Sequence, residues 1–277
     1  TTLRIGGPAE VMVNIHSADE IAVALRAAKQ ADAPVTIIGN GSNLLVRDGG
    51  IRGLVLRISG GLNAIRREGD CLLVQAGASL AAVAAFARDE GLSGMAELGG
   101  IPGTVGGGVL MNAGAYGAEL AQLVTQAEGV SLSDGRRVVY PADRLDFAYR
   151  HSALMDAGVV ITQATLALTP GDPEAIRARM EECAKARREK QPLTLPSAGS
   201  TFKRPEGHFA AKLIDDCGLR GLTVGGAQVS EKHAGFLVNL GGATARDMLE
   251  LMRQVEQRVF EQSGVHLEPE VRILGED

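Results

Sequence analysis

The chain has 277 residues, 45% of them hydrophobic and 22% charged, which is typical of a globular protein with two or three domains. No apolar run is long enough to cross a bilayer, and the start of the chain lacks the charged and apolar regions of a targeting peptide. The net charge of −5 without a basic block, with three tyrosines and no tryptophan, argues against a nucleic-acid partner.

Three cysteines, Cys71, Cys183 and Cys217, are far apart, and no CxxC or Cys/His spacing accompanies them. An odd number of dispersed thiols favours a reducing compartment, and the missing spacing argues against a structural metal. We therefore expect a cytoplasmic protein that binds no metal.

The first part of the chain alternates strand and helix signals. A strand over 11–15 precedes Ser17, Asp19 and Glu20, which form the pattern of a capping box at the start of a helix. A strand over 35–38 completes a βαβ unit. Further strands are expected over 44–46, 54–58 and 72–76.

A second helix signal begins with Ser79 as N-cap and stops at Gly91. Over 124–168, apolar and polar residues alternate around a turn at 133–136, which predicts a hairpin. The first ~170 residues are therefore expected to mix helices and sheets.

The last part of the chain begins with Asp172 and Pro173, an N-cap and a first-turn proline that predict a helix ending near Lys190. Pro192 and Pro196 then indicate a linker. Helices are expected over 208–217 and 244–263, and strands over 236–239 and 271–274.

Two glycine-rich segments, 39–43 and 99–108, carry the clearest functional signal. Glycines let backbone N–H groups crowd onto a phosphate, and Ser42 and Asn43 add side-chain donors. Neither segment has the three-glycine dinucleotide fingerprint or the P-loop lysine, which disfavours a Rossmann or nucleoside-triphosphatase site. The pair suits the pyrophosphate of a long dinucleotide, and ordinary turns are the alternative.

Six motifs in order resemble those of the UDP-N-acetylenolpyruvoylglucosamine reductase family. They are the segments 2–9, 39–46, 101–117, 149–152, 197–203 and 267–272. Together they extend over nearly the whole chain. Because no room exists between Arg150 and Pro173 for the inserted segment whose tyrosine closes over the substrate, the chain is similar to the smaller subtype of the family. What closes its site is left open.

The resemblance implies an α+β fold with an FAD-binding domain of the vanillyl-alcohol-oxidase (PCMH) type over 1–170, built from two α/β subdomains of about 1–57 and 58–170. A C-terminal α+β substrate-binding domain would cover 171–277, and its last strand would return Glu270 to the flavin site. Dissociable FAD is expected because the first glycine loop contains no His or Cys. NADPH as electron donor, UDP-N-acetylglucosamine enolpyruvate as substrate and a monomeric protein of peptidoglycan precursor synthesis are also implied.

In the reaction of this family, NADPH reduces the flavin, and its N5 passes hydride to the enolpyruvyl methylene carbon. The charge that develops beside the carboxylate calls for a fixed cation and a general acid. The resemblance assigns the carboxylate to Arg150, an assisting role to Glu270 and proton delivery to Ser200. From the residues alone, an exposed ion pair, a solvated strand edge and a turn would suit the same three positions.

The matched motifs also imply ligand contacts. The expected FAD contacts are Gly39, Asn40, Gly41, Ser42, Asn43, Leu44, Ile101, Pro102, Gly103, Thr104, Gly106, Gly107, Leu110, Asn112, Gly114 and Ala115. The expected substrate contacts are Tyr116, Arg150, Lys190, Ser200 and Arg204. Arg204 replaces an asparagine that is common in the family, so it either contacts the diphosphate or points to solvent. His233 is expected to make structural hydrogen bonds.

Two other functions stay open from the sequence. A flavin oxidase of the same fold would pass electrons to oxygen, and it would need a base near the flavin instead of an acid beside a carboxylate clamp. A flavin or nucleotide sensor without enzymatic activity would need only the first ~170 residues, and the complete second region argues against it.

Overall fold

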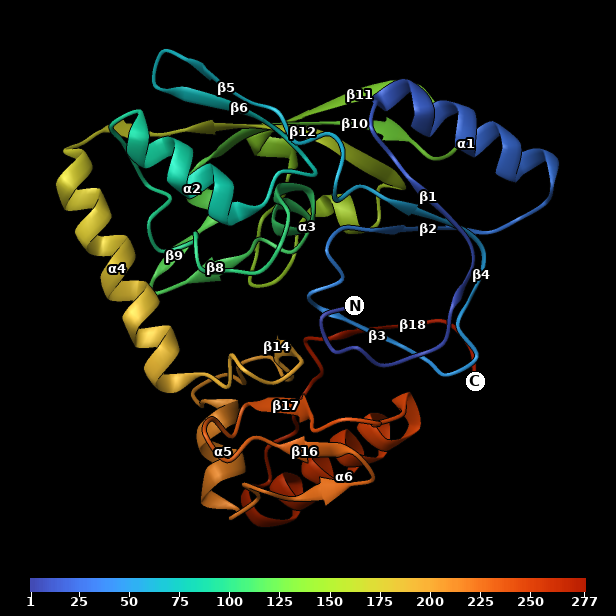
Figure 1. Cartoon of the computed structure of the whole chain (residues 1–277), viewed down its shortest axis with the longest axis vertical. Coiled ribbons are helices and arrows are strands. Elements are labelled where there is room, and N and C mark those ends of the chain that lie inside the picture. The colour runs from blue at the N-terminus through green and yellow to red at the C-terminus, as the bar shows by residue number, and fades with distance from the viewer. The chain divides into compact units, whose positions relative to one another are not determined.

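The computed structural model describes residues 1–277, which form two compact units (Figure 1). The larger unit consists of Val11–Asn40 and Gly53–Ala186, and the smaller unit consists of Thr1–Glu10, Gly41–Arg52 and Arg187–Asp277. This division differs from the predicted domain boundary at residue 170. The reason is backbone pairing, because strand β3 (Leu44–Val46) pairs in parallel with the C-terminal strand β18 (Arg272–Leu274) and so joins an early segment to the end of the chain.

Helix α1 (Ala18–Gln30) begins at the predicted N-cap. The Ser17 hydroxyl accepts the N–H of Glu20 at 3.2 Å. The Glu20 carboxylate, however, accepts the N–H of His16 at 2.8 Å, one residue before the position that a capping box requires. The predicted capping box is therefore only half formed, and its second bond extends to the residue that precedes the cap.

The strands around α1 belong to a three-stranded sheet with the order β1-β4-β2. They are β1 (Ala9–Asn14), β2 (Val35–Ile38) and β4 (Ile51–Arg57). The predicted βαβ unit is present, but β4 lies between its two strands and pairs in parallel with β2.

The second sheet of the larger unit has the order β11-β10-β12-β6-β5, and all its neighbouring strands are antiparallel. Its strands are β5 (Ile65–Glu68), β6 (Cys71–Gln75), β10 (Val124–Ser131), β11 (Arg137–Pro141) and β12 (Val159–Ala167). The predicted hairpin is the pair β10 and β11. Strand β5 was not predicted because three of its four residues are charged and it lies at the sheet edge.

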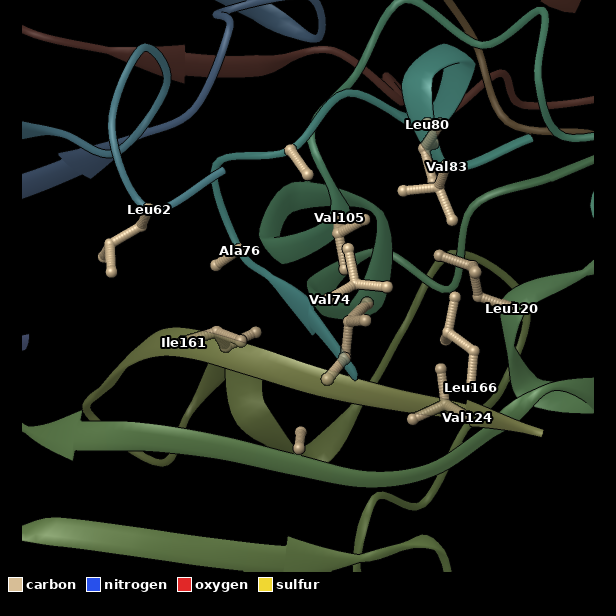
Figure 2. Close-up of a cluster of buried hydrophobic side chains, with 14 of the residues drawn as sticks. Leu62, Val74, Ala76, Leu80, Val83, Val105, Leu120, Val124, Ile161 and Leu166 are labelled. Atoms are coloured by element: carbon tan, nitrogen blue, oxygen red, sulfur yellow. The ribbon is translucent and has the colours of Figure 1, made fainter. Parts of the chain in front are cut away.

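Helices α2 (Leu80–Asp89) and α3 (Val105–Leu110) supply apolar side chains to the core of this unit. Figure 2 shows this core, where Val74 of β6 and Ala76, just after that strand, lie near Val105 of α3 and Ile161 of β12. The Ser79 cap of α2 is confirmed, and Gly91 follows the helix with a left-handed φ of +66°.

Short elements connect these parts. They are β7 (Leu92–Ser93), β8 (Gly114–Ala115), β9 (Ala118–Glu119), β13 (Thr169–Pro170) and the 3₁₀ helices η1 (Leu120–Gln122), η2 (Ala142–Arg144) and η3 (Ala153–Met155). Helix α4 (Pro173–Lys190) begins as predicted, since the Asp172 carboxylate accepts the N–H groups of Glu174 and Ala175.

The smaller unit contains a four-stranded sheet with the order β14-β17-β16-β15. Its elements are β14 (Ser197–Ser200), α5 (Ala210–Asp216), β15 (Thr223–Val224), β16 (Ala227–Val229), β17 (Phe236–Asn239) and α6 (Ala245–Ser263). Thr244 and Asp247 form a complete capping box for α6, and Gly264 ends it with a φ of +70°. No helix of the chain combines the length and the apolar character that crossing a bilayer requires.

Candidate active site

Five of the predicted cofactor residues line one pocket of the larger unit. They are Gly39, Thr104, Gly106, Gly107 and Leu110. The other lining residues were not predicted as contacts and are Ile37, Ile38, Ile58, Ala76, Val159 and Ile161. Its volume of about 100 Å³ is well below the roughly 300–1,000 Å³ of a site for a whole small ligand, so it accommodates only part of a large cofactor.

The glycines of α3 differ in what requires them. A Cβ at Gly108 would lie 2.8 Å from a methyl carbon of Leu120, so packing requires that glycine. A Cβ at Gly107 would meet only the Thr104 hydroxyl at an ordinary 3.5 Å. Glycine in a helix costs roughly 0.8–1.0 kcal/mol relative to alanine, and at Gly107 neither packing nor a left-handed φ explains that cost. Glycine leaves the backbone open to close approach by a ligand, and the FAD contact of Gly107 stays a prediction.

The second glycine-rich segment is not an open loop. Thr104 is the N-cap of α3, and the N–H groups of Val105 and Gly106 donate at 2.8 Å to the carbonyls of Ala78 and Ala76. The N–H groups of Val105 and Gly106 are therefore used by the turn that follows β6, so a phosphate would have to be bound by other groups of this segment, and that contact stays a prediction. Ile101, Pro102 and Gly103 form the turn that leads into this helix.

The first glycine loop spans the division between the units. Gly39 and Asn40 belong to the larger unit, and Gly41, Ser42, Asn43 and Leu44 belong to the smaller one. Within the larger unit, Gly39 approaches Thr104 so closely that a Cβ at Gly39 would lie 2.6 Å from the Thr104 hydroxyl oxygen. The two predicted glycine segments thus meet at this contact, although 65 positions separate Gly39 from Thr104 in the sequence.

Arg150 lies at the tip of a tight turn. The N–H groups of Ala148 and His151 each donate to the carbonyl of the other residue at 3.1 Å, which closes the turn. Arg150 has a φ of +55°, and such a conformation costs a non-glycine residue about 1–3 kcal/mol unless its surroundings fix it. Its guanidinium carbon lies 4.8 Å from the centre of the Tyr149 ring, and Nη2 donates to the Gly114 carbonyl at 3.3 Å.

Asn112 holds this turn from the interior. Its side chain is buried; the amide nitrogen donates to the Ala148 carbonyl at 3.0 Å, and the amide oxygen accepts the Ala121 N–H at 2.9 Å. Both ends of the side chain are thus used inside the protein. The observed role of the side chain is to position the backbone next to Arg150, and the FAD contact of Asn112 stays a prediction.

Tyr116 is presented by a hairpin between β8, which holds Gly114 and Ala115, and β9. Tyr116 and Gly117 form its tip with φ values of +53° and +87°, the pattern of a type I′ turn. The Tyr116 hydroxyl donates to the Cys183 carbonyl of α4 at 3.3 Å. The Gly114 carbonyl of this hairpin also accepts the hydrogen bond from Arg150, so the hairpin that presents Tyr116 helps to position the Arg150 guanidinium.

In the smaller unit, Thr201 connects two of the predicted catalytic residues, because it follows Ser200 in the chain and hydrogen-bonds the backbone of Glu270. Ser200 ends β14, is exposed and pairs with Phe236 of β17. Thr201 is buried, and its carbonyl accepts the N–H of Glu270 at 2.8 Å. The Glu270 carbonyl in turn accepts the Asn43 amide at 3.0 Å. The backbone of Glu270 is therefore held from both sides, by the residue that follows Ser200 in the chain and by Asn43 of the first glycine loop.

The two predicted substrate cations, Lys190 and Arg204, are at exposed positions of the smaller unit, and Lys203, the neighbour of Arg204, is half-buried. Lys190 is the last residue of α4. The Arg204 guanidinium lies over the ring of Phe209, with its carbon 3.9 Å from the ring centre. Lys203 forms an ion pair with Glu268 at 3.1 Å. The ion pair compensates the charge of Lys203, and the contact of Arg204 with a diphosphate stays a prediction.

His233 makes the structural bonds that its sequence context predicted. Its N–H donates to the Ser230 hydroxyl at 3.3 Å, and its Nδ1 accepts the Gly235 N–H at 3.2 Å. Burial lowers the pKa of the imidazole below its ordinary value. A neutral ring packed edge-on against Phe236, with ring centres 4.9 Å apart, therefore supports the strand that faces Ser200.

Two family models match the chain. Residues 191–274 match the model described as UDP-N-acetylenolpyruvoylglucosamine reductase, C-terminal domain, and residues 9–140 match an FAD binding domain. Together with the observed mixture of helices and sheets, these matches confirm the predicted fold class, α+β with an FAD-binding domain before a C-terminal domain.

Relatives match along the full chain. The UDP-N-acetylenolpyruvoylglucosamine reductase of Agathobacter rectalis is 50% identical, with 100% of this chain and 91% of the relative covered. That of Pediococcus pentosaceus is 48% identical, with 100% and 92% covered. The crystal structure of UDP-N-acetylenolpyruvylglucosamine reductase from Thermus caldophilus superimposes with a TM-score of 0.85 at 40% identity, covering 99% of this chain and 95% of that one. This chain belongs to the UDP-N-acetylenolpyruvoylglucosamine reductase family.

Proposed function

We propose that this chain catalyses the NADPH-dependent reduction of UDP-N-acetylglucosamine enolpyruvate to UDP-N-acetylmuramate in the cytoplasm, as a step of peptidoglycan precursor synthesis. The observation that carries the proposal is the full-length match to relatives named for this reaction. Family membership and the FAD-binding match make the chain an FAD-dependent oxidoreductase. NADPH as donor, a monomeric state and dissociable FAD are further parts of the proposal.

Bound FAD supplies hydride to the enolpyruvyl methylene carbon. Arg150 binds the neighbouring carboxylate, because a planar guanidinium meets a carboxylate with two hydrogen bonds and keeps its charge. The turn held by Asn112 fixes the backbone of Arg150 before substrate binds, which supports this role by reducing the ordering that binding requires.

Ser200 delivers the proton to the carbon that carries the developing charge, and Glu270 assists. This assignment is supported by the hydrogen bonds of Thr201 and Asn43, which hold the backbone of Glu270 and the residue next to Ser200 in place. A serine hydroxyl is a weak acid, so the proton transfer requires a neighbouring positive charge that stabilises the alkoxide, or a chain of water molecules that returns a proton to it. Lys190 and Arg204 bind the substrate diphosphate, and Tyr116 contacts the substrate from its hairpin.

A stopped-flow experiment separates this function from that of an oxidase. Enzyme reduced by NADPH under anaerobic conditions is mixed with the enolpyruvyl sugar or with air-saturated buffer, and flavin absorbance is followed. We expect fast reoxidation by the sugar and slow reoxidation by oxygen. Fast reoxidation by oxygen with no response to the sugar would support a flavin oxidase, and a flavin that NADPH leaves oxidised would support a non-enzymatic sensor.

A further inference from the structure

One aromatic ring of the smaller unit is exposed without a packing reason. Phe209 keeps 58% of its surface accessible, more than any other phenylalanine or tyrosine in the chain. It is the N-cap of α5, and its side chain makes no capping bond. Because polar residues are preferred at N-caps, the helix itself does not call for a phenylalanine here.

The Phe209 ring stacks against the guanidinium of Arg204. The Arg204 guanidinium lies over one face of Phe209, with the carbon 3.9 Å from the ring centre. The Arg204 Nε donates to the His208 carbonyl at 3.4 Å, which connects the arginine to the residue before Phe209. Since the guanidinium covers one face, much of the exposed surface belongs to the opposite face of the ring.

The same arginine is suited to a second contact. Stacking uses the faces of the guanidinium, whereas its N–H groups lie in its plane and point outward from its edge. Lys203 is next to it in the chain, and its ammonium is paired with the Glu268 carboxylate at 3.1 Å, so the positive charge offered to a phosphate here is that of Arg204. An aromatic face beside a phosphate-binding edge is complementary to a nucleotide, whose base and diphosphate are linked.

We propose that Arg204 and Phe209 form a stacking platform for the base of a nucleotide substrate. The inference rests on the proposed function, in which the UDP-sugar and NADPH each bring a base and a diphosphate. Arg204 is four positions after Ser200, so their backbones are at most ~14 Å apart, a distance that an extended nucleotide can bridge. The shared chemistry is a planar base, uracil in one substrate and adenine in the other.

Phe209→Ala tests the platform by binding at equilibrium. The FAD-loaded variant is titrated with UDP-N-acetylmuramate and separately with NADP⁺, and the flavin difference spectrum is recorded. We expect the Kd of at least one ligand to rise about 5- to 150-fold, the range that corresponds to ~1–3 kcal/mol of base stacking on an aromatic ring. A rise for UDP-N-acetylmuramate alone assigns uracil, a rise for NADP⁺ alone assigns adenine, and a rise for both assigns one platform used in turn.

Two further variants separate stacking from folding. Phe260→Ala removes another exposed phenylalanine of the same unit, one stacked on His266 with ring centres 4.0 Å apart, and both Kd values should stay unchanged. Phe209→Leu keeps apolar bulk without an aromatic ring, and it should lose the same affinity as Phe209→Ala even where the alanine variant is unstable.

Failure of the platform and failure of the proposed function give different results. Wild-type Kd values for both ligands in Phe209→Ala, or in Phe209→Leu where the alanine variant does not fold, would overturn the platform alone. A wild-type enzyme that NADPH does not reduce, or that the enolpyruvyl sugar does not reoxidise, would overturn the proposed reaction.

Discussion

Replacing Gly107 by alanine should stabilise the apoprotein. The new methyl group would meet only the Thr104 hydroxyl, at 3.5 Å, and Gly107 is the third residue of α3. Alanine is favoured over glycine in a helix by roughly 0.8–1.0 kcal/mol. The free energy of unfolding without cofactor should therefore rise by up to about 1 kcal/mol, and Tm by about 2–4 °C for a domain of this size.

The same methyl group should weaken FAD binding, because Gly107 lines the pocket with Gly39, Leu110 and Ile161. An added carbon in a fitted site costs about 1–3 kcal/mol, which corresponds to a Kd for FAD about 5- to 150-fold higher. A ligand that binds only the folded state stabilises it according to its affinity, so the Tm gain on adding FAD should shrink while the apoprotein Tm rises.

The assay is thermal unfolding of the apoprotein with and without FAD, together with a flavin fluorescence titration. Gly108→Ala is the matched control in the same helix, because its methyl group would lie 2.8 Å from a carbon of the fully buried Leu120. That variant should lose about 1–3 kcal/mol of stability with or without FAD. A Gly107→Ala apoprotein that binds FAD with wild-type affinity would show that FAD does not approach the backbone at Gly107.

Three further predictions concern the catalytic residues and their supports. Asn112→Ala should lower the free energy of unfolding by about 1–3 kcal/mol in chemical denaturation, because the Ala148 carbonyl and the Ala121 N–H each lose their side-chain partner; unchanged stability would count against this role. Ser200→Ala should leave flavin reduction by NADPH nearly intact and slow reoxidation by the sugar about 100-fold or more, and equal losses in both half-reactions would remove Ser200 from proton delivery. Burial lowers the pKa of His233 in the folded protein, so the unfolded chain takes up a proton first as the pH falls below about 6.5. The free energy of unfolding therefore decreases as the pH falls toward the folded pKa. His233→Gln should lose less stability over this pH range, and parallel curves of stability against pH for the variant and the wild type would contradict the assignment.

The sequence was most informative where a helix has a local cap. Ser17, Ser79, Asp172 and Thr244 all cap the predicted helices, because the cap residue and the apolar periodicity lie within a few positions of each other. Helix α3 was missed because glycine is a poor helix former. Its conformation depends on the Thr104 cap and on carbonyls from residues distant in the sequence.

The candidate site was only partly predictable for the same reason. The glycine motifs identified Gly39, Thr104 and Gly107, which line one pocket. Val159 and Ile161 complete that pocket from β12, and no local pattern shows that a strand inside the 124–168 region faces the glycines. The partners of Asn112 were likewise hidden, since the side chain bonds a turn 36 positions away.

The central claim is that this chain binds FAD and uses NADPH to reduce the enolpyruvyl sugar. An anaerobic titration of the purified protein, followed by its visible spectrum, tests the claim most directly. We expect a flavin spectrum that NADPH bleaches and that one equivalent of the enolpyruvyl sugar restores, with UDP-N-acetylmuramate as product. A colourless protein that does not take up added FAD, or a bleached flavin that the sugar leaves reduced, would contradict it.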